Sequence, residues 1–262
     1  GDFGVSDCSQ FLETRYDDPE WEVPEVIIVW GQHPPNGCPD AFFGHWIVDC
    51  MKLGTKIISM DPRNTWMTSR SEHHLKLRPG TDGAMALGML NVILSEGLED
   101  KEFCAKWVHG LDELRERAAE YPVERVAQIT GVPAEEITEA ARFFANAKRA
   151  SIHWGVPIDM CPDGTSVAHA IICLWSITGN IDIPGGQVIA RPSHEVSSYP
   201  YSTEALIDLY GEELVKTLTE KRIGADEYKM VKNFRGWAQP DMVIDQIMTG
   251  EPYPIKGAWI QT

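Results

Sequence analysis

Three short apolar runs constrain the fold of this chain most strongly: VIIVW at 26–30, KIISM at 56–60 and ASIHWG at 150–155. The first run is apolar at every position and rich in β-branched side chains. A strand that is apolar on both faces is typical of a parallel sheet buried between helices. We therefore predict that these runs are strands in the core of an α/β protein.

Segments with helical periodicity separate these strands. A helix is predicted over 40–53, four consecutive helical segments over 98–147, and another helix at about 165–177. Strands that alternate with helices form parallel sheets wound with one hand. The predicted fold is therefore a doubly wound, Rossmann-like parallel sheet with helices on both faces.

A third, shorter strand is expected at 74–78, where the sequence reads HLKLR. Pro79 and Gly80 then turn the chain toward AMALGMLNVILSEG, which has the character of a long helix. Thr81 or Asp82 precedes this helix, and both residue types are favoured as N-caps.

The chain is expected to contain more than this sheet. Residues 1–25 form an acidic, irregular leading segment, 26–192 the Rossmann-like domain, and 193–250 a polar helical extension. The final KGAWIQT retains strand character, so 251–262 is predicted to begin a strand of a following domain. We accordingly expect this chain to be a segment of a longer polypeptide.

Charge restricts the possible partners. Lys and Arg total 23 against 39 Asp and Glu, a formal net charge of −16 among 262 residues. Such a chain repels nucleic acids and anionic membranes at long range, so nucleic-acid binding is not expected. No run of eighteen apolar residues occurs, so membrane insertion is not expected either. A phosphate ligand would have to be held by local donors.

The six cysteines are scattered, without a CxxC pair or a Cys/His cluster at metal-ligand spacing. We interpret them mostly as buried free thiols. They are Cys8, Cys38, Cys50, Cys104, Cys161 and Cys173.

Topology fixes where a ligand should bind. In an open parallel sheet, ligands bind beyond the carboxyl ends of the strands, where the chain connections diverge. Asp61 ends the second strand, a position suited to ribose hydroxyls, and glycines at such turns let backbone N–H groups approach a pyrophosphate. An alternative stays open from spacing alone: Asp61-Pro62 is a strand-terminating turn, and Gly80-Thr81-Asp82 is an N-cap.

Several familiar catalytic signatures are absent from the sequence. It contains no GxGxxG, GxxxxGK[ST], HExxH or GxSxG pattern. The eight histidines, including His73 and His74, are expected to have structural or surface roles.

The order of motifs does resemble one family. WGQHPP, IISMDPR, LRPGTD, NVILSEGL, EITEAARFFANAKRASIHWG and ITGNIDIPGG succeed one another between residues 1 and 192. This string is similar to the molybdopterin oxidoreductases of the dimethyl sulfoxide reductase superfamily. The resemblance implies a Rossmann-like domain that grips one guanine dinucleotide tail of a bis(molybdopterin guanine dinucleotide) cofactor carrying molybdenum or tungsten.

The resemblance also implies a set of cofactor-binding residues. Asp61 would contact ribose or guanine edges, and Asp82 or Thr81 the guanosine. Gln32-His33-Pro34 departs from the family's usual Gly-x-Asn-Pro, and Val156 and Met160 replace polar or longer side chains. The full set is Trp30, Gly31, Gln32, His33, Pro34, Ser59, Met60, Asp61, Pro62, Arg63, Gly80, Thr81, Asp82, Gly155 and Val156.

The parts of such an enzyme that meet the metal are expected upstream. A [4Fe-4S] cluster would lie in the missing N-terminal part, and no metal ligand is expected in this segment. Cys8 is an alternative ligand, but it lies closer to the first strand than a ligand should, which favours a thiol in the pocket wall.

The family implies an oxidoreductase that moves an oxygen atom or a hydride equivalent to or from a small substrate, with an iron–sulfur electron-transfer subunit as partner. Its compartment, cytoplasm or bacterial cell envelope, stays open. Two alternatives are a non-catalytic scaffold such as the large iron–sulfur subunit of respiratory complex I, and an NAD-dependent dehydrogenase. The intact DPR and RPGTD motifs argue against the first, and the missing GxGxxG against the second.

Overall fold

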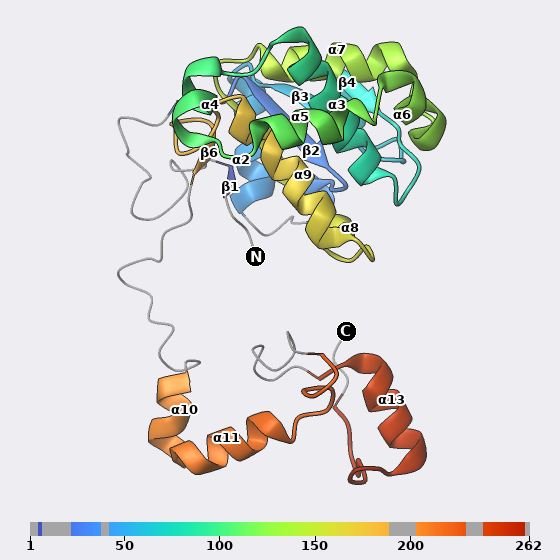
Figure 1. The fold of residues 1–262 in the computed structure, drawn as a ribbon, viewed down its shortest axis with the longest axis vertical. Coiled ribbons are helices and arrows are strands. Elements are labelled where there is room, and N and C mark those ends of the chain that lie inside the picture. The colour runs from blue at the N-terminus through green and yellow to red at the C-terminus, as the bar shows by residue number, and fades with distance from the viewer. Residues whose placement is uncertain (1–4, 7–21, 38–41, 189–202, 229–237, 260–262) are drawn as a thin grey trace. The chain divides into compact units, whose positions relative to one another are not determined.

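The computed structural model describes residues 5–6, 22–37, 42–188, 203–228 and 238–259 (Figure 1). The chain divides into two compact units, Gly1–Arg191 and Pro192–Thr262.

The first unit is built on a four-stranded sheet in the order β4-β3-β2-β5, and all neighbours are parallel. Its strands are β2 (Val26–Trp30), β3 (Lys56–Met60), β4 (His73–Leu75) and β5 (Ala150–Trp154). The chain moves from β2 to β3 and β4 in one direction, and later returns to place β5 on the free side of β2. The strand order therefore reverses between β2 and β5, the switch point at which ligands bind in such sheets.

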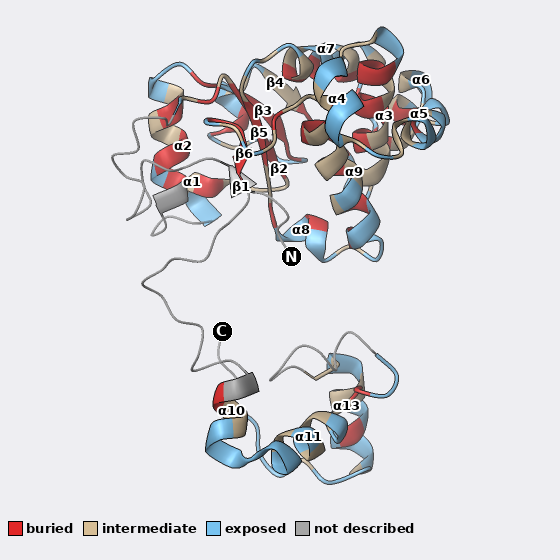
Figure 2. Ribbon diagram, turned by 60° about the vertical axis from the view of Figure 1, so that its left-hand side comes forward, coloured by how far each residue is buried: buried red, intermediate tan, exposed pale blue. Residues whose placement is uncertain are grey.

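Helices cover both faces of this sheet (Figure 2). Neighbouring residues of a strand point to opposite faces. Ile28 therefore faces one side, with α3 (Asp82–Glu96), α7 (Ala134–Ala145) and α9 (Gly164–Ile177), while Ile27 faces α2 (Phe42–Lys52). This arrangement confirms the predicted doubly wound α/β fold.

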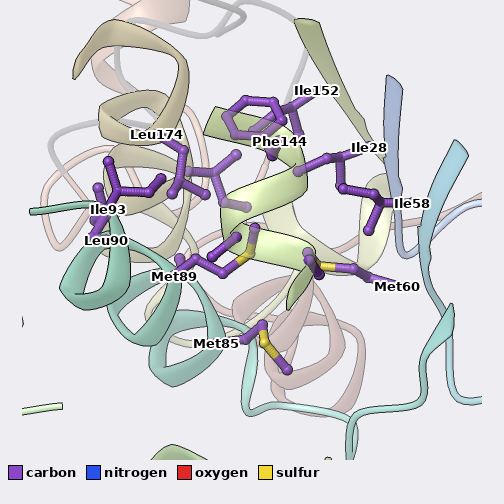
Figure 3. Close-up of a cluster of buried hydrophobic side chains, with 14 of the residues drawn as sticks. Ile28, Ile58, Met60, Met85, Met89, Leu90, Ile93, Phe144, Ile152 and Leu174 are labelled. Atoms are coloured by element: carbon purple, nitrogen blue, oxygen red, sulfur yellow. The ribbon is translucent and has the colours of Figure 1, made fainter. Parts of the chain in front are cut away.

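The larger of two hydrophobic cores among the described residues lies between β2, β3, β5 and the helices α3, α7 and α9 (Figure 3). Ile28, Ile58 and Ile152 project from the sheet toward Met89 and Leu174 of the helices, and all five are buried. Burying one such side chain contributes about 1.5–3 kcal/mol. The parallel register places the last residues of the four strands, Trp30, Met60, Leu75 and Trp154, beside one another.

The third strand differs from its prediction. It covers His73–Leu75 instead of 74–78. The cause is a change of hydrogen-bond partner, because Leu77 turns back to the Leu75 carbonyl and the Arg78 N–H donates to the carbonyl of Thr130, at the end of a distant helix. Residues 76–78 consequently leave the sheet.

The helical stretch over 98–147 is confirmed as α4 (Lys101–Trp107), α5 (Leu111–Ala119), α6 (Val123–Thr130) and α7. Two single-turn helices were not predicted, namely α1 (Pro34–Gly37) after β2 and α8 (Val156–Asp159) after β5.

Two further short elements lie where irregular chain was expected. β1 (Val5–Ser6) pairs antiparallel with β6 (Gln187–Val188), and the three-residue η2 (Thr68–Arg70) follows β3. Elements of two or three residues are too short to leave a periodic pattern in sequence.

The second unit contains α10 (Thr203–Tyr210), α11 (Glu212–Glu220) and α13 (Pro240–Thr249). The strand predicted for 251–262 is not present in the described residues 251–259, which are irregular. A strand needs a hydrogen-bonded neighbour, and no strand pairing recorded for the described chain includes these residues. None of the helices in the described ranges is both long and apolar enough to cross a membrane.

Candidate functional site

The candidate site lies along the carboxyl edge of the sheet, where backbone hydrogen bonds tie the strand ends together. The Gly155 N–H after β5 donates to the Trp30 carbonyl at 2.8 Å, and the Gly31 N–H after β2 donates to the Met60 carbonyl at 2.8 Å. A third hydrogen bond links β4 to the end of β3, because His74 Nε2 lies 2.8 Å from the Asp61 carbonyl oxygen. These bonds join the carboxyl ends of β5, β2, β3 and β4 into one rim.

Two glycines make the rim possible, for different reasons. Gly31 has a φ of 63°, in the left-handed region that favours glycine. Gly155 has an ordinary φ of −98°, but a Cβ there would lie 2.5 Å from the Gly31 carbonyl oxygen and 2.9 Å from Gln32 Cβ. The loops after β2 and β5 can thus approach each other closely at the switch point because Gly155 has no side chain.

His33 lies in the loop that follows β2. Its Nε2 atom is buried and has no hydrogen-bond partner within the described part of the chain. Pro34, also buried, begins α1 directly after it. Leaving a buried polar atom unpaired costs about 1–3 kcal/mol, so a ligand group that bonds this nitrogen would recover that free energy.

Asp61 ends β3 and is buried, with 2% of its side chain exposed. Its Oδ1 accepts hydrogen bonds from the Arg63 backbone N–H at 2.8 Å and from Nε at 3.0 Å, while Oδ2 accepts from Nη2 at 2.8 Å. Burial raises the pKa of Asp61, but these bonds and the charges of Arg63 and His74 outweigh burial and hold the pKa below its usual range. Asp61 is therefore an ionised acceptor.

Arg63 controls access to that acceptor. Its side chain is 66% exposed while it pairs with Asp61. Oδ2 of Asp61 keeps a lone pair, but the carboxylate is so buried that a ribose hydroxyl reaches it only if Arg63 shifts. The predicted contact between Asp61 and ribose therefore requires a movement of Arg63, which the sequence pattern did not indicate.

His74 is a residue to which the sequence analysis assigned no site role. Because a carbonyl only accepts, His74 donates its Nε2 proton to the Asp61 carbonyl. The contact depends on the parallel register that places His74 beside Ser59 on β3. This contact could be predicted from sequence only if the pairing register of β3 and β4 were already known.

The expected side-chain N-cap of α3 is not present. Thr81 occupies the N-cap position, but its Oγ1 donates to the Arg78 carbonyl at 2.6 Å instead of capping the helix. Asp82 lies in the first turn of α3, where its Oδ1 accepts a hydrogen bond from Trp30 Nε1 at 2.8 Å. The Asp82 side chain thus bonds a residue 52 positions away and does not cap the helix.

Arg78 anchors this loop and was also missed. Its Nη1 donates to the carbonyls of Gln128 and Ile129 at 2.8 and 3.0 Å. These carbonyls belong to the last turn of α6, where a cation is favoured. Arg78 was visible within the RPGTD motif, but its partners lie 50 and 51 residues away.

The other predicted cofactor-binding residues fall into a buried group and an exposed group. The side chains of Ser59 and Met60 are buried within the sheet, so a ligand could meet only their backbone. Pro62, Gly80 and Val156 are exposed on the rim.

The potential metal ligands of the described ranges are dispersed. No three His, Cys, Asp or Glu side chains gather there as a metal site would require. Cys50, Cys104, Cys161 and Cys173 are free thiols, the first two buried and the others half-buried. Cys8 and Cys38 lie outside the described residues.

A family model for molybdopterin oxidoreductases matches residues 9–233. The chain belongs to the molybdopterin oxidoreductase family. The family relationship that its motif order suggested, to the dimethyl sulfoxide reductase superfamily, is thereby confirmed.

Named relatives agree with this assignment. Acetylene hydratase from Syntrophotalea acetylenica is 35% identical over 228 residues, 79% of this chain and 30% of the relative. Formate dehydrogenase H from Escherichia coli is 33% identical over 160 residues, 61% of this chain and 22% of the relative. These relatives are named as enzymes, which favours an enzyme over a scaffold.

A solved structure supports the same assignment. Acetylene hydratase from Pelobacter acetylenicus superimposes with a TM-score of 0.71 and 31% identity, covering 88% of this chain and 34% of that one. The chain thus spans about a third or less of the length of these proteins.

Membership in the family implies a molybdopterin cofactor with molybdenum or tungsten. The polar groups of the rim fit such a cofactor, because they include both hydrogen-bond donors and acceptors. The rim offers the buried, unpaired Nε2 of His33, the half-buried carboxylate of Asp82, and the exposed guanidinium of Arg63.

Proposed function

We propose that residues 26–192 form the domain that holds one guanine dinucleotide tail of a bis(molybdopterin guanine dinucleotide) cofactor. The observation that carries the proposal is the rim itself. Gly31 and Gly155 join the loops at the switch point between β2 and β5, and Asp61 and Asp82 flank it on neighbouring elements. Dinucleotides bind at this place in Rossmann-like sheets.

Local donors must hold the diphosphate, because the chain carries a net charge of −16. The N-terminus of the 15-residue helix α3 faces this edge and carries a partial positive charge. Arg63 adds an exposed guanidinium beside Asp61. The two carboxylates would accept hydrogen bonds from the nucleoside, Asp61 from ribose and Asp82 from guanine.

The full-length protein is proposed to catalyse a two-electron redox reaction on a small substrate, by oxygen-atom or hydride-equivalent transfer. The bound cofactor would supply the electron chemistry, and this chain would orient its nucleotide end. A [4Fe-4S] cluster and an iron–sulfur partner subunit would carry the electrons. Support comes from family membership and from relatives named formate dehydrogenase.

A second reaction is favoured by one observation. Acetylene hydratase from Syntrophotalea acetylenica is 35% identical over 79% of this chain, and a solved acetylene hydratase superimposes on 88% of it. Hydration adds water without net electron transfer. The two candidates differ in whether the reaction consumes an artificial electron acceptor.

The test is the composition of the full-length protein, produced in cells that make the cofactor. Molybdenum or tungsten, pterin fluorescence and released guanine nucleotide are expected together in fixed ratio. In Asp61→Ala the bound guanine should fall several-fold, while the control Asp49→Ala, on the side of α2 that faces solvent, should match the wild type. A matured protein without metal and pterin would contradict the proposal.

A further inference from the structure

We infer that Trp30 is a positioning residue, whose indole N–H fixes the Asp82 carboxylate so that it distinguishes guanine from bases without a 2-amino group. This inference rests on the proposed function. It assigns to Trp30 a specificity role that acts through another residue.

In the Trp30–Asp82 pair, the hydrogen-bond donor is held rigidly and the acceptor lies at the rim. Trp30 is the last residue of β2 and is fully buried in the larger core, so packing fixes the orientation of its ring. Its Nε1 lies 2.8 Å from Oδ1 of Asp82, in the first turn of α3. Asp82 itself is half-buried at the rim. One end of the bond is thus locked in the core while the other faces the candidate site.

The hydrogen bond from Trp30 leaves lone pairs on the Asp82 carboxylate that could accept hydrogen bonds from a nucleotide base. Oδ1 of Asp82 keeps a second lone pair beside the Trp30 bond, and Oδ2 accepts no hydrogen bond from the described residues. Guanine offers two adjacent donors, N1–H and the 2-amino group, that match two carboxylate oxygens. Hypoxanthine offers N1–H alone, and adenine places an acceptor at N1.

Preorganisation explains why the indole matters. A carboxylate free to rotate loses conformational freedom when it binds a base, at a cost of about 0.5–1.5 kcal/mol per side chain, which converts to a roughly two- to tenfold loss of affinity. Trp30 removes this cost before the ligand arrives. The gain in affinity is largest for a base that must bond both Asp82 oxygens at the same time.

The neighbourhood of Asp82 provides no second donor of this kind among the described residues. The nearby half-buried Cys161 thiol donates to the Ile158 carbonyl. Burial, followed by the side chain of Asp163 and the charge of Asp82, raises the pKa of this thiol. Trp30 is therefore the described group that orients Asp82.

The chain offers a matched control for this substitution. Trp175 is also fully buried in the same core, but its Nε1 has no hydrogen-bond partner within the described part of the chain. Trp30→Phe and Trp175→Phe each shrink one buried ring, and only the first removes a hydrogen bond to Asp82.

The experiment titrates GDP and IDP into the wild-type chain and both variants, followed by NMR so that millimolar dissociation constants are measured. The wild type should prefer GDP. Trp30→Phe should reduce the GDP-to-IDP preference about two- to tenfold with little change in IDP affinity, and Trp175→Phe should keep the wild-type preference. Equal preferences in the two variants would overturn the inference, as would equal weakening of both nucleotides.

Asp82→Ala keeps the test decisive if Trp30→Phe does not fold. In the wild-type chain the Trp30 indole N–H should exchange slowly with solvent, and in Asp82→Ala it should exchange faster and shift. Asp82→Ala should also lose the preference for GDP. Slow exchange that persists in Asp82→Ala would contradict the pairing. A wild type that binds GDP without preferring it would overturn the role of Trp30 alone, whereas a wild type that binds neither nucleotide would overturn the proposed function as well.

Discussion

A methyl group added at Gly155 should push apart the two loops that form the switch point. The backbone conformation there, φ −98° and ψ 172°, suits alanine, so no conformational strain enters. The added Cβ would lie 2.5 Å from the Gly31 carbonyl oxygen and 2.9 Å from Gln32 Cβ. Because non-bonded carbon atoms rest about 3.5–4.0 Å apart, the loops must separate by roughly 1 Å.

The expected cost follows from two opposing terms. Overpacking of this kind costs about 1–3 kcal/mol, while replacing glycine with alanine restricts the unfolded chain and recovers about 0.4–1 kcal/mol. Gly155→Ala should therefore lower the free energy of unfolding by about 1–2 kcal/mol. The amide resonances of Gly31 and Gln32 should also move.

Urea unfolding followed by circular dichroism measures this change. Gly37→Ala is the matched control, because a Cβ at Gly37 would meet no atom of the described residues within 4 Å and the residue lies in the neighbouring helix α1. It should be neutral or slightly stabilising. A Gly155→Ala variant as stable as Gly37→Ala, with unchanged Gly31 resonances, would refute the close approach of the loops.

Three further predictions concern groups around the same sheet. The lowered pKa of Asp61 means that its contribution to stability is complete above about pH 4 and is lost as pH falls through the folded-state pKa. Urea midpoints of Asp61→Asn should accordingly vary less with pH in that acidic window than wild-type midpoints, and equal variation would contradict the ion pair. Burial lowers the pKa of His153 to about 4, so stability should decline from about pH 6.5 to pH 4 by roughly 3 kcal/mol. His153→Gln should remove that decline, and a retained decline would assign it to another group. Arg78→Ala should cost about 1–2 kcal/mol and speed amide exchange at 80–82, whereas unchanged exchange there would show that Arg78 does not anchor the loop.

The strands of the sheet could be predicted from sequence because burial on both faces leaves an unmistakable apolar run. The bounds of β2 and β3 agree with the sequence prediction, and β5 ends one residue earlier than predicted. β4 could not be delimited in this way, because the partner that ends it, the Thr130 carbonyl, lies far along the chain. Local pattern predicts elements, and distant hydrogen bonds decide where they stop.

The candidate site follows the same division. The alternation of strands and helices along the chain is enough to predict that Gly31, Asp61, Asp82 and Gly155 share one edge of a parallel sheet. What those residues contact could not be predicted, since Asp61 pairs with Arg63 and Asp82 with Trp30 through side-chain geometry. These contacts depend on the folded positions of the side chains, which local sequence patterns do not specify.

The most direct test of the central claim is the NMR footprint of GDP on this chain. The account predicts that amide shifts concentrate at the carboxyl edge of the sheet, at residues 31–33, 61, 63, 80–82 and 155–156, and that Asp82→Ala reduces those at 80–82 most. Shifts concentrated at the opposite edge, where Val26, Lys56 and Ala150 begin their strands, or no shifts with millimolar GDP, would contradict it.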